Sequence, residues 1–572
     1  MKKITRVVLS CIGLLTLAII VSLSSPAGRD PLPEPQTEPA ENCTVIMVGR
    51  EASTDGSVFA THAADCGICD WTFHFVPPSD HKPGETRPVY NIGQMRTWPP
   101  SQGGKWEMVL KDPADLELPQ PAHTFGYIHG VFGYMNDQQV AMGESTIGNV
   151  RKLSNPTPGP KFNITMLTLL AMERARTARE AIKLMGSLAE KYGYGYLDGG
   201  EMLAVSDASE VWNFEIMPVG PLWKPGGNKP GAVWAAQRVP DDQVAVCPNE
   251  SRIGEIDLSR PDLFLASSNY MSLAVEQKLY DPKSGQPFSW KKAYSPAEGS
   301  AALSARRSRM WRFFNLVAPS LGLKPELANM DYPFSVKPDK KLSLADVMAI
   351  TRDKSQGTIF DPVRGIRGGP FANPNIYQKT RLISIPNAEY TTIAQTRSGW
   401  PSMIGGIVWL AWGAQDTSCY LPLYAGITEL PPSFSVGDHW ELNRDSARWA
   451  FDYTDFHTQP VYSEAIKDVQ EAQAKHEGRI MARIPEVDKE ALALYQKSPQ
   501  EAAAYLTQFC LATAQDVVKA WWKLGDDLLV KYNHLAYYLA AKRGREWARP
   551  RPVPLWEQAT KIMDVLAEQA EK

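Results

Sequence analysis

The stretch Cys43-Thr-Val-Ile-Met-Val-Gly49 is a short β-branched, apolar run that ends at a glycine, and it predicts a buried strand. Ala52-Ser-Thr-Asp-Gly56 has the composition of a turn, and Ser57-Val-Phe-Ala-Thr-His62 alternates as a returning strand does. Two antiparallel strands of similar length bring the first residue of one beside the last residue of the other. We therefore expect a hairpin in which the second strand carries Thr61, His62 and Asp65 close to Cys43.

The residues before this hairpin are not expected to belong to the fold. Lys2, Lys3 and Arg6 precede an apolar run over 7–23, and small residues follow, which is the layout of a secretory signal peptide over 1–25. The run is about 17 residues long, the lower limit for crossing a bilayer, so an uncleaved N-terminal anchor stays open. Residues 26–42 are rich in proline and lack apolar periodicity, as in an extended linker or a propeptide. We expect export to the periplasm or the extracellular space.

Composition limits the classes of function. The chain has 572 residues, of which 44% are hydrophobic, enough for one large core and a smaller second unit. The net charge of −3 gives no basic excess, so nucleic acid is not expected as a partner. Seven cysteines in a chain of this size do not form a disulfide scaffold. Cys66 and Cys69 form a C-x-x-C pair, for which a local disulfide stays open.

Further elements follow from periodicity and capping signals. Thr177-Ala-Arg-Glu180 reads as a capping box for a helix that stops at Gly193, and Ser343-Leu-Ala-Asp346 opens a shorter helix. Helical periodicity dominates from near residue 440, with Ser498-Pro-Gln-Glu501 as a strong start. The pattern indicates an α+β body with a helical C-terminal part. Strand-like runs are expected over 132–135, 139–143, 201–206, 211–216, 233–237 and 243–246, and helices over 484–545 and 556–571.

The chemistry depends on Cys43. The chain has no G-x-S-x-G, H-E-x-x-H or phosphate-loop motif, and its nine histidines lack the spacing of a metal site, so we expect neither metal nor organic cofactor. If the bond between Asn42 and Cys43 is cut, Cys43 gains an α-amino group with a pKa near ~8. That amine could take the thiol proton, so that one residue supplies nucleophile and base. The alternative is a small apolar side chain in a core strand.

Several blocks resemble the dipeptidase A family of N-terminal-nucleophile (Ntn) cysteine hydrolases, which includes the secernins. The first block runs from Cys43 through Thr61-His-Ala-Ala-Asp-Cys66, and the similarity continues in order to about residue 430. The later blocks are Met135-Asn-Asp-Gln-Gln-Val-Ala-Met-Gly-Glu-Ser-Thr146, Ser206-Asp-Ala-Ser-Glu-Val-Trp-Asn-Phe-Glu215, Trp234-Ala-Ala-Gln-Arg-Val-Pro-Asp241 with Asn249, and Gln356-Gly-Thr-Ile-Phe-Asp361 with Gly369-Pro-Phe371.

The resemblance implies a four-layer αββα sandwich and a set of site residues. Cys43 matches the nucleophile, and Asp65 matches an acidic residue that would orient the free amine. Asn136 matches an Asn that, as an amide donor, is a candidate oxyanion stabiliser. Arg238 matches an Arg that could hold a substrate carboxylate or steady Asp65. Related hydrolases often carry an Arg about three residues before the Asp, where this chain has Thr61-His62, which leaves the substrate preference open.

The resulting hypothesis is an exported cysteine-type dipeptidase, made as an inactive precursor, with a catalytic domain over 43–435 and a mainly helical region over 436–572. The expected partner is a dipeptide substrate; membrane anchoring before processing and a homo-oligomer stay open. Two alternatives remain at this stage. One is an amidase of N-acyl compounds, such as penicillin or bile-acid amides, on the same fold. The other is a non-catalytic, secernin-like protein.

Overall fold

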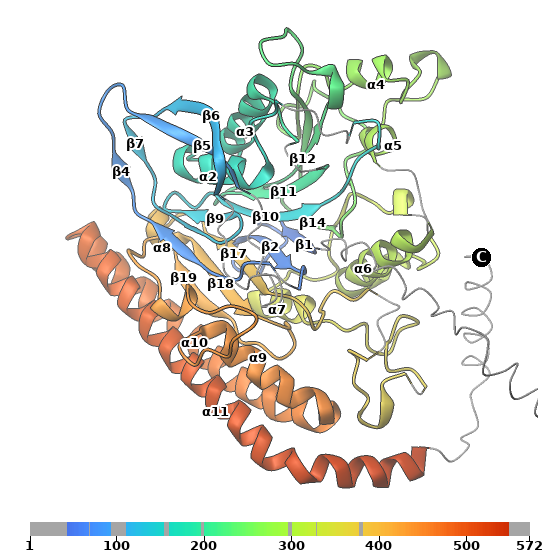
Figure 1. Cartoon of the computed structure of the whole chain (residues 1–572), viewed down its shortest axis with the longest axis vertical. Coiled ribbons are helices and arrows are strands. Elements are labelled where there is room, and N and C mark those ends of the chain that lie inside the picture. Colours follow the sequence, from blue (N-terminus) through green and yellow to red (C-terminus); the bar gives the residue numbers. More distant parts are fainter. Residues whose placement is uncertain are drawn as a thin grey trace, which may run out of the picture. The chain divides into compact units, whose positions relative to one another are not determined.

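The computed structural model describes residues 43–67, 69–92, 110–153, 159–195, 199–295, 300–327, 329–365, 367–376 and 381–547. Two antiparallel sheets form its centre (Figure 1). The first has the order β16 (Ser335–Val336), β14 (Val244–Cys247), β1 (Val45–Val48), β2 (Val58–Ala64), β17 (Tyr390–Thr396), β18 (Ile407–Trp412) and β19 (Leu421–Tyr424). The second has the order β15 (Phe264–Ala266), β13 (Ala232–Arg238), β12 (Val211–Pro218), β11 (Glu201–Ser206), β10 (Ala141–Thr146), β9 (Gly133–Asn136), β8 (Tyr127–His129) and β3 (His74–Val76).

The predicted hairpin is confirmed. β1 pairs with β2 in an antiparallel register that sets Met47 opposite Ala60 and Val48 opposite Phe59. Continued towards the start of β1, this register brings Cys43 opposite Ala64, one residue before Asp65. On its other edge β1 pairs with β14, with Val45 opposite Cys247. The first residues of β1 therefore lie between the end of β2 and the end of β14.

Alternating side chains of the hairpin serve two cores. Val45, Met47, Val58 and Ala60 are buried in one cluster with residues of the second sheet, including Met202 and Ala204 of β11. Ile46, Val48 and Phe59 point the other way, into the larger cluster that includes residues of the helices outside the first sheet. This two-sided burial explains why the strand reads as a continuous apolar run.

Helices cover the outer face of each sheet (Figure 1). α2 (Ile164–Arg174) and α3 (Ala178–Tyr192) pack against the second sheet, at β9 and at β11 to β13. α6 (Ser300–Val317), α9 (Ala447–Thr458) and α11 (Pro499–Trp547) pack against the first sheet, at β14, β18 and β19. The order helix, sheet, sheet, helix confirms the expected αββα sandwich.

The helical C-terminal region is confirmed, and its first helix begins close to residue 440, where helical periodicity was predicted to become dominant. α9 starts at Ala447, and α10 (Tyr462–Tyr495) passes through Pro485. Ser498 caps α11, accepting a hydrogen bond from the Glu501 amide at 3.3 Å. The expected helix at 556–571 and the predicted signal peptide and linker lie outside the described residues. Among the helices that the structure describes, none is long and apolar enough to cross a membrane.

Two of the predicted helix starts carry their caps. Thr177 accepts from the Glu180 amide, and Gly193 ends α3 with a positive φ of 83°. Ser343 and Asp346 form a reciprocal capping box on α7 (Leu344–Thr351). The remaining elements are the small sheets β4 (Ser79–Asp80) with β7 (His123–Thr124) and β5 (Thr86–Ile92) with β6 (Leu110–Pro119), and the short helices α4 (Ser272–Glu276), α5 (Trp290–Tyr294) and α8 (Ser402–Gly405).

Candidate active site

Cys43 is a buried thiol at the start of the first central strand. Its backbone carbonyl accepts a hydrogen bond from Nη1 of Arg309 at 2.8 Å, and the same Nη1 donates to the Thr44 hydroxyl at 2.8 Å. Arg309 comes from α6, and its side chain is buried. A charged group is rarely buried without strong partners. The guanidinium therefore holds the backbone of Cys43 in one position.

Arg309 also connects the start of β1 to the residues that follow β14. Its Nη2 donates to the Pro248 carbonyl and to Oδ1 of Asn249, both at 3.0 Å. Burial lowers the pKa of Arg309, with the charge of Arg381 acting in the same direction, and the nearby Asp65 opposes both. The site thus concentrates charged groups where water is excluded, and there their interactions are stronger than in bulk solvent.

Asp65 lies one residue beyond β2 and interacts electrostatically with Arg309, the residue that donates to the Cys43 carbonyl. Its carboxylate is buried and forms an ion pair with Arg381, and Gln415 donates to its other oxygen at 3.4 Å. Burial raises the pKa of the Asp65 carboxyl, while Arg381, Arg309 and Gln415 act in the opposite direction. Two guanidinium groups therefore support this carboxylate.

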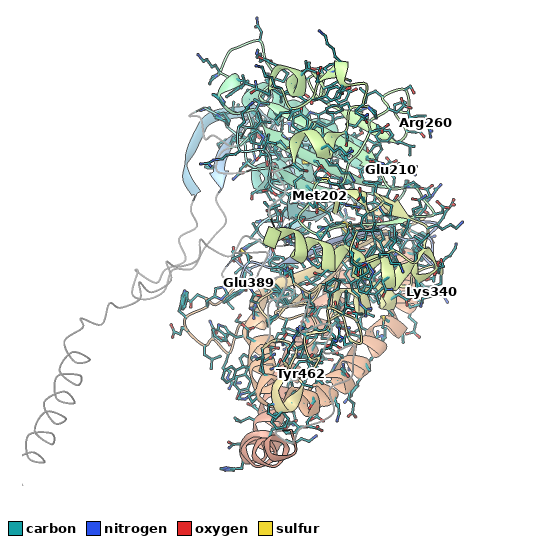
Figure 2. The ribbon with its side chains drawn as sticks, turned by 90° about the vertical axis from the view of Figure 1, so that its right-hand side faces the viewer. Met202, Glu210, Arg260, Lys340, Glu389 and Tyr462 are labelled. Atoms are coloured by element: carbon teal, nitrogen blue, oxygen red, sulfur yellow. A yellow bond between two sulfur atoms is a disulfide. The ribbon has the colours of Figure 1, made fainter. Side chains whose placement is uncertain are left out.

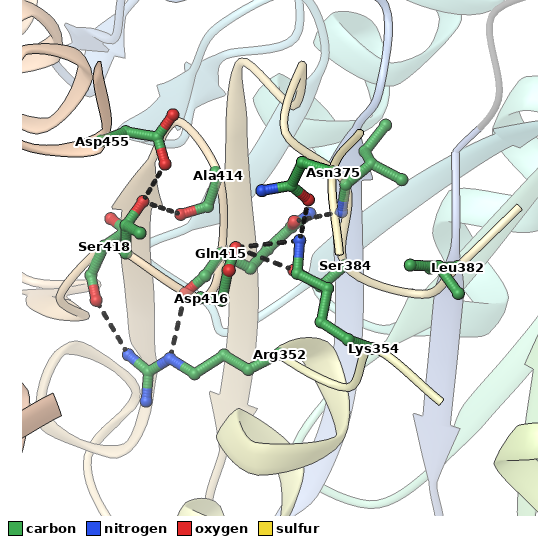
Figure 3. Close-up of polar contacts among 12 residues, drawn as sticks. Arg352, Lys354, Asn375, Leu382, Ser384, Ala414, Gln415, Asp416, Ser418 and Asp455 are labelled. Atoms are coloured by element: carbon green, nitrogen blue, oxygen red, sulfur yellow. Dashed lines mark hydrogen bonds and ion pairs between the residues drawn. The ribbon is translucent and has the colours of Figure 1, made fainter. Parts of the chain in front are cut away.

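The loop that carries Gln415 is anchored from several sides (Figure 3). Oε1 of Gln415 accepts from the Ile385 amide at 3.0 Å, and its backbone carbonyl accepts from Nε of Arg352 at 3.1 Å. Arg352 in turn pairs with Glu477 of α10, with Nη1 and Oε2 2.9 Å apart. Through these contacts the C-terminal helices help to position the side chain that faces Asp65.

Asn249 lies just beyond β14. Arg309 connects Asn249 to Cys43, because its guanidinium donates both to Oδ1 of Asn249 and to the Cys43 carbonyl. The φ of Asn249, 61°, is left-handed, and the residue is 2% exposed. Asparagine adopts this region more readily than other non-glycine residues, because its short polar side chain can hydrogen-bond locally. The backbone amide of Asn249 donates to the Ser145 hydroxyl at 3.1 Å and its side-chain amide to the Thr146 carbonyl at 2.9 Å.

His62 of β2 and Glu144 of β10 lie between the two sheets, near Cys43. Nδ1 of His62 lies 2.8 Å from the Glu144 carbonyl oxygen, and both side chains are buried. Burial lowers the pKa of His62 to about 4, so its imidazole is neutral at physiological pH. The hydroxyl groups of Tyr134 and Tyr390, which hydrogen-bond to each other, lie nearby. Burial raises the pKa of both phenols.

Asn136 is engaged elsewhere. Its side-chain amide donates to the carbonyls of Met172 and Ala175 at 2.9 and 2.8 Å, which caps the end of α2. Its Oδ1 accepts from the Gln138 and Val140 amides at 3.1 and 2.9 Å. All of its polar atoms thus serve a turn and a helix end, and the structure does not bring it together with Cys43 as the sequence led us to expect.

Arg238 lies at the opposite end of the strands. It forms ion pairs with Glu210, at 2.9 Å, and with Asp241, whose backbone carbonyl accepts from the Glu51 amide just beyond β1. The seven residues from Cys43 to Gly49 span on the order of 20 Å of strand. Arg381, and not Arg238, pairs with Asp65.

Cys66 and Cys69, next to Asp65, are joined by a disulfide. Of the two outcomes that the C-x-x-C spacing left open, the structure has the bonded one. The bond closes a small loop directly after the strand that delivers Asp65.

The model of the family described as Peptidase family C69 matches residues 42–475. The chain belongs to peptidase family C69. The match starts one residue before Cys43, includes every strand of the two central sheets together with Asp65, Arg309 and Arg381, and ends within α10. The family resemblance inferred from the blocks of sequence is thereby confirmed.

Relatives of this C69 chain are named as dipeptidases. Dipeptidase A of Lactobacillus helveticus is 26% identical over 417 residues, which cover 70% of this chain and 79% of the relative. A probable dipeptidase of Salmonella dublin is 28% identical over 410 residues, with 69% and 83% covered. Probable dipeptidase B of Lactococcus lactis is 25% identical over 503 residues, with 84% and 94% covered.

Among solved structures, penicillin V acylase from Agrobacterium tumefaciens matches with a TM-score of 0.27 and 11% identity, covering 67% of this chain and 86% of that one. A likeness at this level adds nothing to what the strand order shows.

Three residues of this C69 site were not singled out from the sequence. Arg309 and Arg381 lie 266 and 316 positions from the groups they contact, Cys43 and Asp65, and no local pattern connects them. Asn249 did carry a signal, because it belongs to one of the blocks that resemble the family. Its connection to Cys43 follows only from the contacts of Arg309.

Proposed function

We propose that this chain is an exported cysteine-type dipeptidase whose nucleophile is the thiol of Cys43. The observation that carries the proposal is the buried guanidinium of Arg309, which donates to the Cys43 carbonyl at 2.8 Å and interacts electrostatically with both Cys43 and the buried carboxyl group of Asp65. Membership of family C69 and the dipeptidase names of the relatives support the reaction class.

In the proposed active form Cys43 is the first residue of the chain. Its α-amino group, with a pKa near ~8, is partly neutral at physiological pH and takes the thiol proton. Asp65, opposite the start of β1, orients that amine. The family match from residue 42 supports a mature chain that begins here, since the preceding residues contribute nothing to it.

The proposed reaction has two stages. The Cys43 thiolate attacks the carbonyl carbon of the dipeptide and a C–S bond forms. The ammonium group returns its proton to the amide nitrogen as the C–N bond breaks, which releases the C-terminal amino acid. Water then adds to the thioester, the C–S bond breaks, and the N-terminal amino acid leaves.

Export and processing belong to the same proposal. The n-region, apolar run and proline-rich segment before Cys43 support a secretory leader followed by a propeptide. The disulfide between Cys66 and Cys69 fits an oxidising compartment, where such bonds persist. The chain would then be made as an inactive precursor.

A substrate panel tests the reaction. We expect the mature protein to hydrolyse unmodified dipeptides and to leave the same dipeptides uncut when their amino group is acetylated. Cys43→Ser serves as the matched inactive control. Preferential hydrolysis of N-acyl amino acids would show that the protein is an amidase on the same fold and not a dipeptidase. No hydrolysis of either class by correctly processed protein would contradict the proposal.

A further inference from the structure

We propose that Cys43, His62 and Glu144 form a binding site for a thiophilic divalent metal ion, such as Zn²⁺ or Cd²⁺, and that the bound ion blocks the thiol. The site goes beyond the proposed function, because it would act on the chain as an inhibitor and takes no part in hydrolysis. Binding by the three side chains does not depend on peptide cleavage.

The geometry of the cluster suits a metal ion. One ligand atom from each residue, a sulfur, a ring nitrogen and a carboxylate oxygen, lies within 4.8 Å of the other two, and all three residues are buried. Bonds of about 2.0–2.3 Å in a tetrahedral site put ligand atoms roughly 3.3–3.8 Å apart. Side-chain movements of about 1 Å would therefore close the site around an ion of this size.

The close approach of the two sheets brings the ligands together. Cys43 and His62 belong to the hairpin of the first sheet, whereas Glu144 lies on β10 of the second. The preceding residue on β10 is Gly143, where a Cβ atom would lie 2.2 Å from the Thr61 carbonyl oxygen and 3.3 Å from Cβ of His62. Only glycine permits this contact. The sequence separation of the three ligands explains why no metal spacing could be recognised before folding.

The contacts of His62 favour a ligand role. Its Nδ1 is oriented by the Glu144 carbonyl oxygen at 2.8 Å, an arrangement that fixes ring orientation in many metal sites. Its Nε2 is buried and has no hydrogen-bond partner among the residues that the structure describes. Buried polar atoms are usually satisfied, so an orphaned ring nitrogen in a fully buried histidine calls for an explanation. A metal ion coordinated by Nε2 would supply the missing interaction; the Glu144 carboxylate lies 4.0 Å from Nδ1 of the same ring, so the imidazole would turn to present Nε2 to the ion.

The donor set is that of zinc. Thiolate sulfur and imidazole nitrogen are the common ligands of Zn²⁺, and a carboxylate oxygen completes many three-residue sites. The ion displaces the proton of the Cys43 thiol to solvent as the S–metal bond forms. A fourth position remains for water. In the mature chain it could be taken by the α-amino group of Cys43, a detail that rests on the proposed function.

Cadmium titration of the purified chain tests the site directly. We expect an ultraviolet absorption band from charge transfer between thiolate and Cd²⁺ that saturates at one ion per chain, and competition by Zn²⁺. Alkylation of Cys43 by iodoacetamide, followed by peptide mass spectrometry, should slow by at least about tenfold when Zn²⁺ is bound, because a coordinated thiolate is shielded.

Matched variants separate a site from a lone reactive thiol. Cys43→Ser should abolish the band, and His62→Gln and Glu144→Gln should each weaken Cd²⁺ binding by at least about tenfold. Cys510→Ala, which removes a buried thiol of α11 with no role in the site, should leave the titration unchanged. Thermal unfolding shows whether each variant is folded. If His62→Gln does not fold, the Cd²⁺ titrations of Glu144→Gln and Cys43→Ser decide whether the metal site exists.

Three results would overturn the metal site: no band in the unmodified chain, a band that persists in Cys43→Ser, or equal affinity in folded Glu144→Gln. These outcomes are distinct from failure of the proposed function. A chain that binds one Cd²⁺ ion through Cys43 but hydrolyses no dipeptide would retain the metal site and lose the dipeptidase.

Discussion

The two ends of the hairpin formed by β1 and β2 differ sharply in their electrostatics. At the Cys43 end, Arg309 and Asp65 are almost completely buried. At the Gly49 end, Arg50 and Asp241 form an ion pair with side-chain exposures of 44% and 19%. In Figure 2 Glu210, a partner of Arg238, lies above and to the right of Glu389, whose backbone amide donates to the Ala64 carbonyl.

The difference indicates what each end does. Burying a charge costs several kcal/mol unless partners compensate, whereas an exposed ion pair contributes about 0–1 kcal/mol. Charges kept in the interior near Cys43 therefore fit the catalytic role that we propose for this end of the hairpin. The Gly49 end has the ordinary ion pairs of a protein surface, and Arg238 belongs to it.

Replacing Cys43 should have the largest effect. We expect Cys43→Ala to lower kcat/KM for dipeptides by at least about 10⁴-fold, because no other group supplies the nucleophile. The measurement is steady-state kinetics on protein whose N-terminus has been verified. Retention of more than a few per cent of activity would place the nucleophile elsewhere. If Cys43→Ala is still processed to the same N-terminus, another protease removes the leader.

Arginine replacements at the two ends compare stability. Arg309→Met should lower the free energy of unfolding by about 3–5 kcal/mol, since it strips partners from buried polar groups around Cys43. The control Arg50→Met should change it by about 0–1 kcal/mol. Urea unfolding followed by fluorescence measures both. Similar losses at the two ends would remove the contrast in burial on which this reasoning depends.

Aspartate replacements compare activity in the same way. Asp65→Asn keeps the shape of the side chain but removes the charge paired with Arg381, and we expect kcat/KM to fall by about 10²-fold or more. Asp241→Asn, at the Gly49 end, should leave kcat/KM within about twofold, because its partners Arg50 and Arg238 lie at the opposite end of the hairpin from Cys43. Equal effects of the two variants would show that Asp65 acts only through the stability of the fold.

The smallest effect on turnover is expected at Asn136. Asn136→Ala should reduce stability by about 1–3 kcal/mol, because the carbonyls at the end of α2 lose their donor. The kcat of the folded fraction should remain close to that of the unmodified enzyme. An oxyanion donor would instead cost about 10²–10³-fold in kcat, so kinetics at a temperature well below unfolding separates the two roles.

Local patterns were sufficient to predict the parts of the site that depend on neighbouring residues. The apolar run ending at Gly49, the turn at 52–56 and the returning strand predicted the hairpin of β1 and β2, because hairpin geometry follows from sequence spacing. The capping signals at Thr177 and Ser343 were sufficient for the same reason. Family resemblance added the αββα arrangement, which periodicity alone does not give.

The remaining features depend on tertiary contacts. Arg309 and Arg381 reach the site from distant segments, and the contacts of Arg309 that connect Asn249 to Cys43 leave no trace in the local sequence. Proline normally breaks a helix, yet α10 continues through Pro485, where the packing of the C-terminal helices overrides local propensity. Asn136 and Arg238 were assigned to the site because of their positions in sequence blocks that resemble the family. A position in such a block does not show which groups a side chain contacts in the folded protein.

Mass spectrometry of the intact, active protein tests the nucleophile most directly. The protein is expressed with its full leader, purified by dipeptidase activity, and its N-terminus is determined before and after alkylation of the thiol. We expect all activity in a chain that begins at Cys43, with one alkyl group on that residue accompanying complete inactivation. A fully active chain that begins at Glu41 or earlier would contradict an N-terminal nucleophile, because the amine of Cys43 would still be an amide.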